Sequence, residues 1–354
     1  MSLIGAARAE GSPDVLATLT RVADAQGQGS LARRLAELGE LVRWDMRAVE
    51  DALDELPPAA DVVRKSAHHL IARGGKRLRP MCVAVAARCG TGFDARGRDL
   101  AVAVELVHCA TLLHDDVVDL GDQRRGAPAA RLLFGNAASI FAGDWLLVHA
   151  LKRVRAVRVD GTLDRLLDII DEMILAEAIQ LEHRGRVDTS EEAYFRVVEG
   201  KTAALFRWAT FAGARAGGLD DRASHALETY GLHLGNAFQL VDDWLDYAGD
   251  AAKTGKTLFA DLREGKMTYP VLYARERDPR VRPLLEEIVA SPEVPAALGQ
   301  SLLGALEKAG ALEATRRLAG EHVAKALDAI AELPEGRGKD ALHTVALATI
   351  ERER

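Results

Sequence analysis

The segment ELVHCATLLHDDVVD, Glu105–Asp119, ends an apolar run on an Asp-Asp-x-x-Asp cluster. A second cluster of the same form closes GNAFQLVDDWLD, Gly235–Asp246. Residues three and four apart share a helix face, so the outer aspartates of each cluster project together. Carboxylates about 4 Å apart repel by about 4 kcal/mol at an effective dielectric of about 20, so we expect a cation to offset them. The aspartates concerned are Asp115, Asp116, Asp119, Asp242, Asp243 and Asp246.

The chemistry of these clusters indicates a metal ion and a phosphate. Their ligands are oxygen atoms without an interleaved His or Cys, which suits Mg²⁺. Mg²⁺ in proteins also binds substrate phosphates, so the sequence predicts a phosphorylated substrate. A solvated acidic helix is the plain alternative. Apolar neighbours of both clusters argue against that alternative: Leu112, Leu113, Val117, Val118, Phe238, Leu240, Val241, Trp244 and Leu245.

The surrounding sequence predicts an all-α fold. Proline is absent from Ala129 through Tyr269, and apolar residues recur there at spacings of three and four. Leu35, Leu38 and Val42 indicate an amphipathic helix after a cap at Ser30, whereas the first thirty residues are expected to be loosely ordered. Further helices are expected at 60–72, 80–90, 98–119, 136–156, 162–183, 190–216, 221–249, 267–277, 281–290, 295–309 and 311–331.

Length and composition favour one large domain. The 354 residues are 48% hydrophobic and show no linker, repeat or low-complexity tract. We expect a partly helical N-terminal extension, 1–45, followed by a single domain, 46–354. The extension is interpreted as an extra surface helix, with a brace for a dimer as the alternative.

Charge and cysteine content exclude several classes. A net charge of −7 without a basic stripe argues against nucleic-acid binding. The spacing of Cys82, Cys89 and Cys109 fits neither a zinc site nor a disulfide framework. No signal peptide and no run of about 20 apolar residues is present, so we expect a soluble cytoplasmic protein. Peripheral membrane contact during product release is left open.

Basic and glycine-rich segments accompany the acidic clusters. The run Gly74–Pro80 combines flexible backbone, three cations and a proline suited to a helix start, which indicates an anion cradle. A solvated basic loop is the alternative. Arg124 and Arg125, just beyond the first cluster, can hold a second anion, and His108 lies two turns before Asp115 on the same face. Single lysines follow glycines at Lys201, Lys256 and Lys266.

In this order, the motifs resemble the trans-prenyl diphosphate synthases of the polyprenyl synthetase family. The resemblance covers roughly Pro57 to Pro270 in the blocks GGKRLRP, ELVHCATLLHDDVVDLGDQRRG, GNAASIFAGDWLL, GKT, GNAFQLVDDWLDY and DLREGK. It implies a helical bundle around a central cavity. It also implies a prenyltransferase that joins isopentenyl diphosphate to an allylic prenyl diphosphate, with about three Mg²⁺ ions and a homodimeric assembly.

The resemblance also implies roles for particular residues. Asp115, Asp119 and Asp242 would hold Mg²⁺, with supporting roles for Asp116, Asp243 and Asp246. Thr202 and Gln239 would shield the allylic cation. The allylic diphosphate would contact Arg124, Lys201, Lys256 and Lys266. Isopentenyl diphosphate would lie in a metal-free site formed by Gly75, Lys76, Arg79, His108 and Arg125.

The resemblance also implies that product length depends on the residues four and five before the first aspartate of the first cluster. Ala110 and Thr111 are small, which favours an open tunnel and a long-chain product of the kind used as a quinone side chain. Phe141 or Trp145 would shorten the product to geranylgeranyl or another short or medium length if either blocked the tunnel. A class I terpene cyclase and a non-catalytic partner subunit are remote alternatives. A cyclase has no need for the second diphosphate site, and a silent subunit is expected to have lost aspartates.

Overall fold

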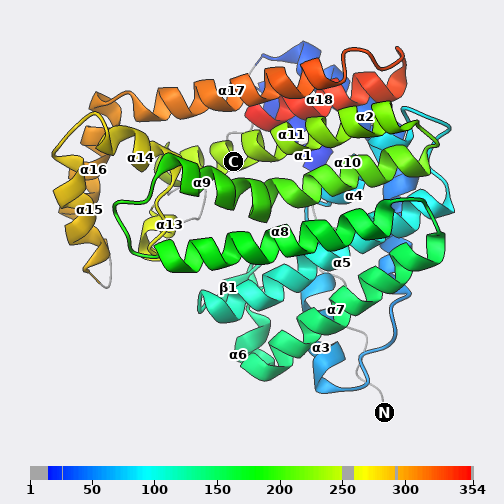
Figure 1. Ribbon diagram of the computed structural model, residues 1–354, viewed down its shortest axis with the longest axis horizontal. Coiled ribbons are helices and arrows are strands. Elements are labelled where there is room, and N and C mark those ends of the chain that lie inside the picture. Colours follow the sequence, from blue (N-terminus) through cyan, green and yellow to red (C-terminus); the bar gives the residue numbers. More distant parts are fainter. Residues whose placement is uncertain (1–14, 26, 249–258, 292–293, 352–354) are drawn as a thin grey trace. The chain divides into compact units, whose positions relative to one another are not determined.

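The computed structural model describes residues 15–25, 27–248, 259–291 and 294–351. Figure 1 shows that helices make up most of this length, so the all-α prediction is confirmed. The elements are α1 Val15–Ala25, α2 Gly29–Asp54, α3 Val62–Ile71, α4 Leu78–Ala87, α5 Ala95–Val118, β1 Gln123–Arg124, β2 Ala127–Pro128, α6 Ala130–Phe134, α7 Asn136–Val157, α8 Thr162–His183, α9 Glu191–Val197, the π-helix η1 Val198–Ala203, α10 Ala204–Ala216, α11 Asp221–Ala248, α13 Ala260–Arg263, α14 Tyr269–Arg275, α15 Val281–Val289, α16 Ala296–Lys308, α17 Ala311–Ala329 and α18 Arg337–Ile350.

The long helices begin and end within three residues of their predicted limits. Helix α5 has a clear start signal, because the Asp94 carboxylate accepts hydrogen bonds from the backbone N–H groups of Arg96 and Gly97. Its middle, Leu100 to Val107, is buried on every side, which is why its apolar residues run continuously rather than at a helical period. This rigid core helix carries the first aspartate cluster.

Several elements were not predicted. Helices α1, α6, α13 and α18 were missed, and so was a two-residue antiparallel pairing of β1 with β2. The predicted helix at 190–216 is divided into α9, η1 and α10. The expectation of loose order in the first thirty residues is wrong for α1, which packs on α2.

The N-terminal segment is part of the core. Leu35, Leu38 and Val42 are at most 2% exposed, and the same buried face continues through Val49 and Leu53. The boundary expected at 45/46 therefore falls inside α2, whereas the interpretation of the N-terminal segment as an extra surface helix, or as a brace for a dimer, stays a prediction. One apolar stripe at helical spacing runs through the whole helix, and it packs on α4 and α5.

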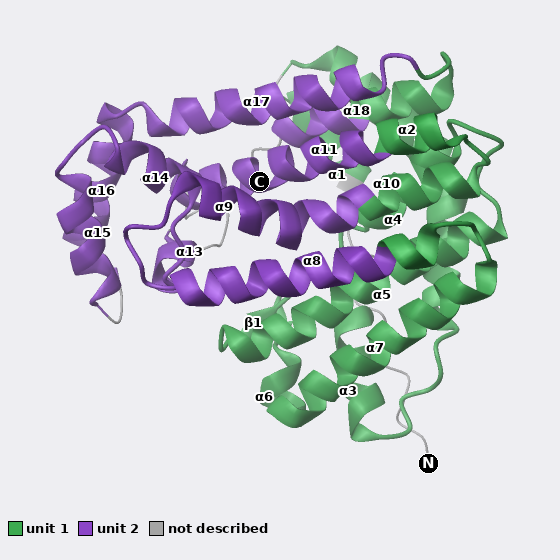
Figure 2. Ribbon diagram, viewed as in Figure 1, with its two compact units in different colours: residues 1–165, 208–227, 333–344 green, residues 166–207, 228–332, 345–354 purple. Residues whose placement is uncertain are grey.

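The chain divides into two compact units, drawn in different colours in Figure 2. Unit 1 comprises Met1–Arg165, Trp208–Leu227 and Leu333–Thr344, and unit 2 comprises Leu166–Arg207, Glu228–Glu332 and Val345–Arg354. The core of unit 1 includes the buried faces of α4 and α5. The core of unit 2 gathers α11, α14, α15 and α16 around Leu240, Val271, Leu285 and Leu302. The single-domain expectation stays a prediction.

Candidate active site

The first aspartate cluster lies at the carboxyl end of α5, in unit 1. Asp115 and Asp116 occupy the last turn, and Asp119 is the C-cap residue, whose N–H donates to the Asp115 carbonyl at 2.8 Å. The exposed carbonyls of a helix end carry partial negative charge, so carboxylates there are disfavoured unless a cation approaches. The local fold therefore concentrates negative potential at this helix end.

Asp116 is the buried member of that cluster, at 1% exposure. Its Oδ1 accepts from Arg124 Nε at 2.8 Å and lies 2.7 Å from Arg124 Nη2. Its Oδ2 is also buried and accepts no hydrogen bond from the described residues. Arg124, predicted to bind the allylic diphosphate, thus also compensates the charge of Asp116.

The hairpin of β1 and β2 separates the two arginines. Arg125 and Gly126 form its turn, with φ of 52° and 71°, as a type I′ turn requires. Arg124 pairs with Asp116, whereas Arg125 donates from Nη1 to the Leu70 carbonyl at 3.2 Å and from Nη2 to Glu105 at 3.5 Å. The two neighbouring arginines therefore have different partners. This difference is consistent with the prediction that Arg124 and Arg125 bind different diphosphates.

The glycine-rich loop reaches the second of these arginines. A Cβ on Gly75 would lie 2.9 Å from Arg125 Nη2, so a larger residue here would make the end of the Arg125 side chain shift. The structure therefore brings together Gly75 and Arg125, two residues predicted to share an anion site. Lys76 of the same loop is exposed, and Arg79 in the first turn of α4 is partly exposed.

Arg77 corrects the prediction of a cradle with three cations. It is 7% exposed and turns inward, where it forms ion pairs with Glu50 and Glu105. Its backbone adopts a left-handed conformation, φ 48°, at the N-cap of α4. This conformation sets Arg77 apart from Lys76 and Arg79, and a role in binding an anion stays a prediction for Lys76 and Arg79.

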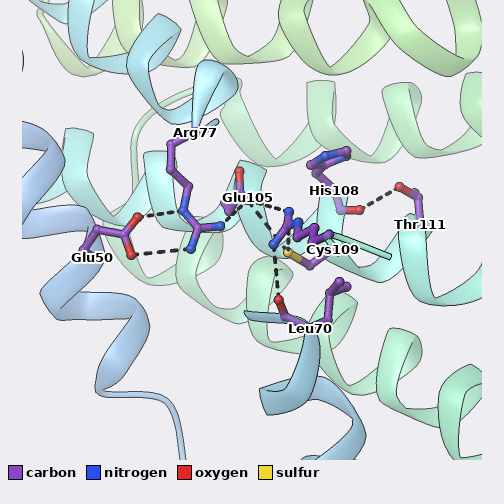
Figure 3. A network of polar contacts seen from close by, with 8 residues as sticks. Glu50, Leu70, Arg77, Glu105, His108, Cys109 and Thr111 are labelled. Atoms are coloured by element: carbon purple, nitrogen blue, oxygen red, sulfur yellow. Dashed lines mark hydrogen bonds and ion pairs between the residues drawn. The ribbon is translucent and has the colours of Figure 1, made fainter. Parts of the chain in front are cut away.

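Figure 3 draws His108 with the polar network of Arg77, Glu105 and Cys109. Burial lowers the pKa of His108 well below 6.5, and the positive charges of Arg79, Arg125, Arg124 and Arg77 lower it further. The imidazole is therefore neutral at neutral pH and can donate one hydrogen bond without adding charge. The backbone carbonyl of His108 accepts a hydrogen bond from Thr111 Oγ1 at 2.8 Å.

The second cluster lies near the carboxyl end of α11, in unit 2, and its middle aspartate is held by neutral donors. Asp243 is 1% exposed and accepts from Tyr194 Oη at 2.5 Å and from Gln239 Nε2 at 2.7 Å. The backbone N–H of Tyr269 adds a third contact at 3.5 Å. Burial raises the pKa of Asp243 to about 6, although the hydrogen bonds from Tyr194 and Gln239 lower it.

Gln239 connects this aspartate to η1. Thr202 Oγ1 donates to Gln239 Oε1 at 2.7 Å, so Thr202, Gln239 and Asp243 form one chain of hydrogen bonds. Thr202 and Lys201 belong to η1, and π-helical turns occur frequently at functional sites. The structure therefore brings together Thr202 and Gln239, the two predicted cation-shielding residues.

Structural partners are known for three further predicted residues of unit 2: Asp246, Lys201 and Lys266. Asp246 accepts from the N–H groups of Ala260 and Asp261 at 3.0 and 3.3 Å, which anchors the start of α13. Lys201 Nζ lies 2.6 Å from Glu177 Oε2, and Lys266 pairs with Glu264. Lys256 lies outside the described residues.

Both clusters are suited to a hard cation that a ligand helps to bind. Within the described residues, no group of three or more His, Cys, Asp or Glu side chains is already gathered for a metal ion. Mg²⁺ commonly takes one or two carboxylates together with substrate phosphates and water, and the all-oxygen donors at both helix ends fit that pattern. The available Oδ2 of Asp116 is consistent with this fit.

Residues 60–301 match the sequence model of the Polyprenyl synthetase family. This chain is a polyprenyl synthetase. It is 35% identical over 327 residues to octaprenyl diphosphate synthase from Escherichia coli (strain K12), covering 90% of this chain and 99% of that protein. It is 32% identical to an all-trans-nonaprenyl-diphosphate synthase from Rhodobacter capsulatus, covering 88% and 96%. The enzyme is therefore a prenyltransferase of the trans-prenyl diphosphate synthase type.

Solved structures agree on the fold of this polyprenyl synthetase. A polyprenyl synthase from Caulobacter crescentus CB15, complexed with calcium and isoprenyl diphosphate, has a TM-score of 0.84 and 37% identity over 90% of this chain and 98% of that one. A decaprenyl diphosphate synthase from Rhodobacter capsulatus has a TM-score of 0.83 and 36% identity, with the same coverage. The helical bundle implied by the family resemblance is thereby confirmed as the isoprenoid synthase fold of these polyprenyl synthases.

The residues expected to set product length occupy different environments in this polyprenyl synthetase. Ala110 is buried at 2% exposure, and Thr111 is partly buried. Phe141 is 59% exposed on α7, whereas the Trp145 ring packs against His149 at an interplanar angle of 43°, with centroids 4.1 Å apart. Phe141 would limit a tunnel only if another surface covered it. The role of each of these residues stays a prediction.

Sequence reasoning missed Glu105, Tyr194 and Glu177, which contact predicted site residues. The sequence could have indicated Glu105, because it is the one charged residue in the run Ala101–Val107. It also lies three and four residues before His108 and Cys109. Tyr194 and Glu177 left no such signal, since their partners are distant in sequence and only the fold unites them.

Proposed function

We propose that this prenyltransferase joins isopentenyl diphosphate to an allylic prenyl diphosphate, giving an all-trans, long-chain polyprenyl diphosphate. Similarity over nearly the whole chain to an octaprenyl diphosphate synthase supports the reaction class. The small pair Ala110 and Thr111, five and four residues before Asp115, is the observation that carries the length assignment. Burial of the apolar surface of each added five-carbon unit contributes about 3 to 4 kcal/mol of favourable free energy, so an open tunnel favours elongation.

The aspartates, arginines and lysines would bind the allylic diphosphate. Asp115, Asp119 and Asp242 would hold about three Mg²⁺ ions, with Asp246 as a further ligand. When bound, these ions neutralise the departing diphosphate. Arg124, Lys201, Lys256 and Lys266 would bind its oxygens. Because Lys201 is paired with Glu177, the incoming diphosphate would compete with that carboxylate.

Thr202 and Gln239 would face the allylic carbon as its C–O bond breaks. Thr202 donates its hydroxyl proton to Gln239, which leaves the hydroxyl lone pairs available to shield positive charge. The double bond of isopentenyl diphosphate then forms the new C–C bond. The proton lost from isopentenyl diphosphate passes to the released diphosphate, so no protein base is required.

Isopentenyl diphosphate would bind Gly75, Lys76, Arg79, His108 and Arg125 without a metal ion. The nearness of Gly75 to Arg125 and the neutral state of His108 support this assignment. A terpene cyclase would not need this site. In a synthase, Arg79→Ala should raise the KM for isopentenyl diphosphate, whereas independence from that substrate would favour cyclisation.

A homodimer is also proposed. Ile140, Phe141 and Val148 of α7 are 41%, 59% and 46% exposed, an apolar surface suited to a second copy. Size-exclusion chromatography with light scattering should give twice the chain mass. Within the described residues, none of the helices combines the length and apolar character needed to cross a membrane. Cytoplasmic location and peripheral membrane contact stay predictions.

Product analysis tests the proposal. Radiolabelled isopentenyl diphosphate is supplied with Mg²⁺ and farnesyl or geranylgeranyl diphosphate, and the dephosphorylated products are separated by chromatography. We expect products of about forty carbons or more, and shorter products from Ala110→Phe. A wild-type stop at about twenty carbons, extended by Phe141→Ala, would favour the geranylgeranyl alternative. A folded protein that incorporates no label would favour a non-catalytic partner subunit.

A further inference from the structure

The buried carboxylate of Glu105 is the centre of the polar network in Figure 3. Glu105 is 2% exposed on α5, and its Oε1 accepts from Arg77 Nη1 and from Arg125 Nη2 at 3.5 Å. Cys109 Sγ, one turn later, lies 3.8 Å from the same oxygen. One carboxylate oxygen therefore serves two guanidinium groups from different elements.

The charges of this network are balanced in pairs. Arg77 also contacts Glu50 of α2, with Nε to Oε1 at 2.7 Å and Nη2 to Oε2 at 3.4 Å. Two glutamates thus compensate two arginines. Without the Glu105 charge, the buried guanidinium groups would repel each other and Arg125 would lose its anionic partner.

The same contacts fix the plane of the Arg125 guanidinium. Nη1 is held by the Leu70 carbonyl, and Nη2 is held by Glu105 and lies 3.9 Å from Cys109 Sγ. A planar fork that is held at two nitrogens has one orientation, and the cost of ordering it is met before a ligand arrives.

We propose that Glu105 is a positioning residue for isopentenyl diphosphate, holding Arg125 in the orientation that binds the diphosphate. This inference rests on the proposed function. Glu50 links α2 to this network, because it binds Arg77, which in turn contacts Glu105. Helix α2 precedes the family match, which begins at residue 60, yet it contributes a charge to this network.

The test compares Glu105→Gln with a matched ion pair outside the network. Asp45 of α2 is 6% exposed and receives Arg88 Nε and Nη2 at 2.6 and 2.8 Å. Asp45→Asn therefore removes a buried carboxylate of the same kind. Both variants are assayed for kcat and for the KM of each substrate, and isopentenyl diphosphate binding is measured by calorimetry without Mg²⁺.

For Glu105→Gln we expect the KM and Kd for isopentenyl diphosphate to rise about tenfold, with the allylic KM within about twofold of wild type. Asp45→Asn should leave both KM values unchanged. Glu105→Asp, which restores the charge, should recover part of the affinity. An unchanged Kd in Glu105→Gln, or equal rises in both KM values, would overturn the proposal.

Two further outcomes keep the inference separate from the proposed function. If wild-type protein neither binds nor incorporates isopentenyl diphosphate, the function itself fails. If wild type is active and Glu105→Gln does not fold, Glu50→Gln replaces it, since the Glu50 side chain is 33% exposed and its loss is milder. An increase of about threefold in the KM for isopentenyl diphosphate is then expected, and a wild-type KM would overturn the role of Glu105.

Discussion

The middle aspartates of the two clusters share a motif position and a buried state, but their partners differ. Asp116 is compensated by a full positive charge from Arg124. Asp243 is held by a phenol, an amide and a backbone N–H, and burial raises its pKa to about 6. The same Asp-Asp-x-x-Asp motif thus occurs in one site organised by an ion pair and in another organised by neutral hydrogen bonds. The motif alone does not determine which.

The largest expected effect comes from an outer aspartate, which is predicted to hold Mg²⁺ in either environment. Asp115→Asn should lower kcat/KM by about a thousandfold, or about 4 kcal/mol of transition-state stabilisation, and weaken the dependence of rate on Mg²⁺. The control is Asp122→Asn, whose side chain is 76% exposed and pairs with Arg131. Steady-state assays across a Mg²⁺ titration measure both. Similar losses in the two variants would remove the basis for assigning a metal role.

Tyr194→Phe tests the neutral organisation of the second cluster. Loss of the hydroxyl should loosen Asp243 and, through it, the amide that faces Thr202. We expect kcat to fall about thirtyfold, or about 2 kcal/mol, with the KM for isopentenyl diphosphate unchanged. The matched control is Tyr247→Phe, because Tyr247 is also buried and its hydroxyl bonds to Thr268 at 2.9 Å. Equal effects of the two substitutions would reduce Tyr194 to a packing role.

Stability should distinguish the two environments directly. Arg124→Gln leaves the buried Asp116 without its counter-charge and should cost about 2 kcal/mol, a value lowered because the Arg124 side chain is 35% exposed. Tyr194→Phe removes one hydrogen bond and should cost about 1 kcal/mol. Urea unfolding in the absence of metal measures both free energies. A larger cost for Tyr194→Phe would contradict the distinction between ion pair and neutral bond.

The smallest effect concerns one histidine in each unit. Burial and neighbouring arginines lower the pKa of His108 well below 6.5, and burial lowers the pKa of His322 to about 4, with His233 adding to the shift. Because the unfolded chain then binds more protons, stability that is present above about pH 6.5 is lost as pH falls toward the folded-state pKa. Each group adds at most about 1.4 kcal/mol per pH unit. His108→Gln and His322→Gln should each flatten the decline between pH 6.5 and 5, and an unchanged slope would refute the shift.

Local pattern predicted the long helices and the positions of both clusters. Helix α11 has apolar residues at helical spacing, and α5 has a continuous apolar run that ends on the first cluster, so the limits of both helices were close to those expected. The hairpin at Arg124 and Arg125 was missed because two-residue strands have no alternating pattern, and η1 was missed because a π-turn depends on packing rather than composition. The assignment of Arg77 to the cradle was wrong because its inward orientation depends on a left-handed backbone and on two glutamates that are distant in sequence.

The most direct test of two separate substrate sites is calorimetry with and without metal. Isopentenyl diphosphate is titrated into wild-type protein in Mg²⁺ and in EDTA, and so is a non-hydrolysable thiodiphosphate analogue of the allylic substrate. We expect the same Kd for isopentenyl diphosphate in both buffers and loss of analogue binding in EDTA. Binding of isopentenyl diphosphate that also requires Mg²⁺ would contradict a metal-free site at Arg125 and the separation of the two sites.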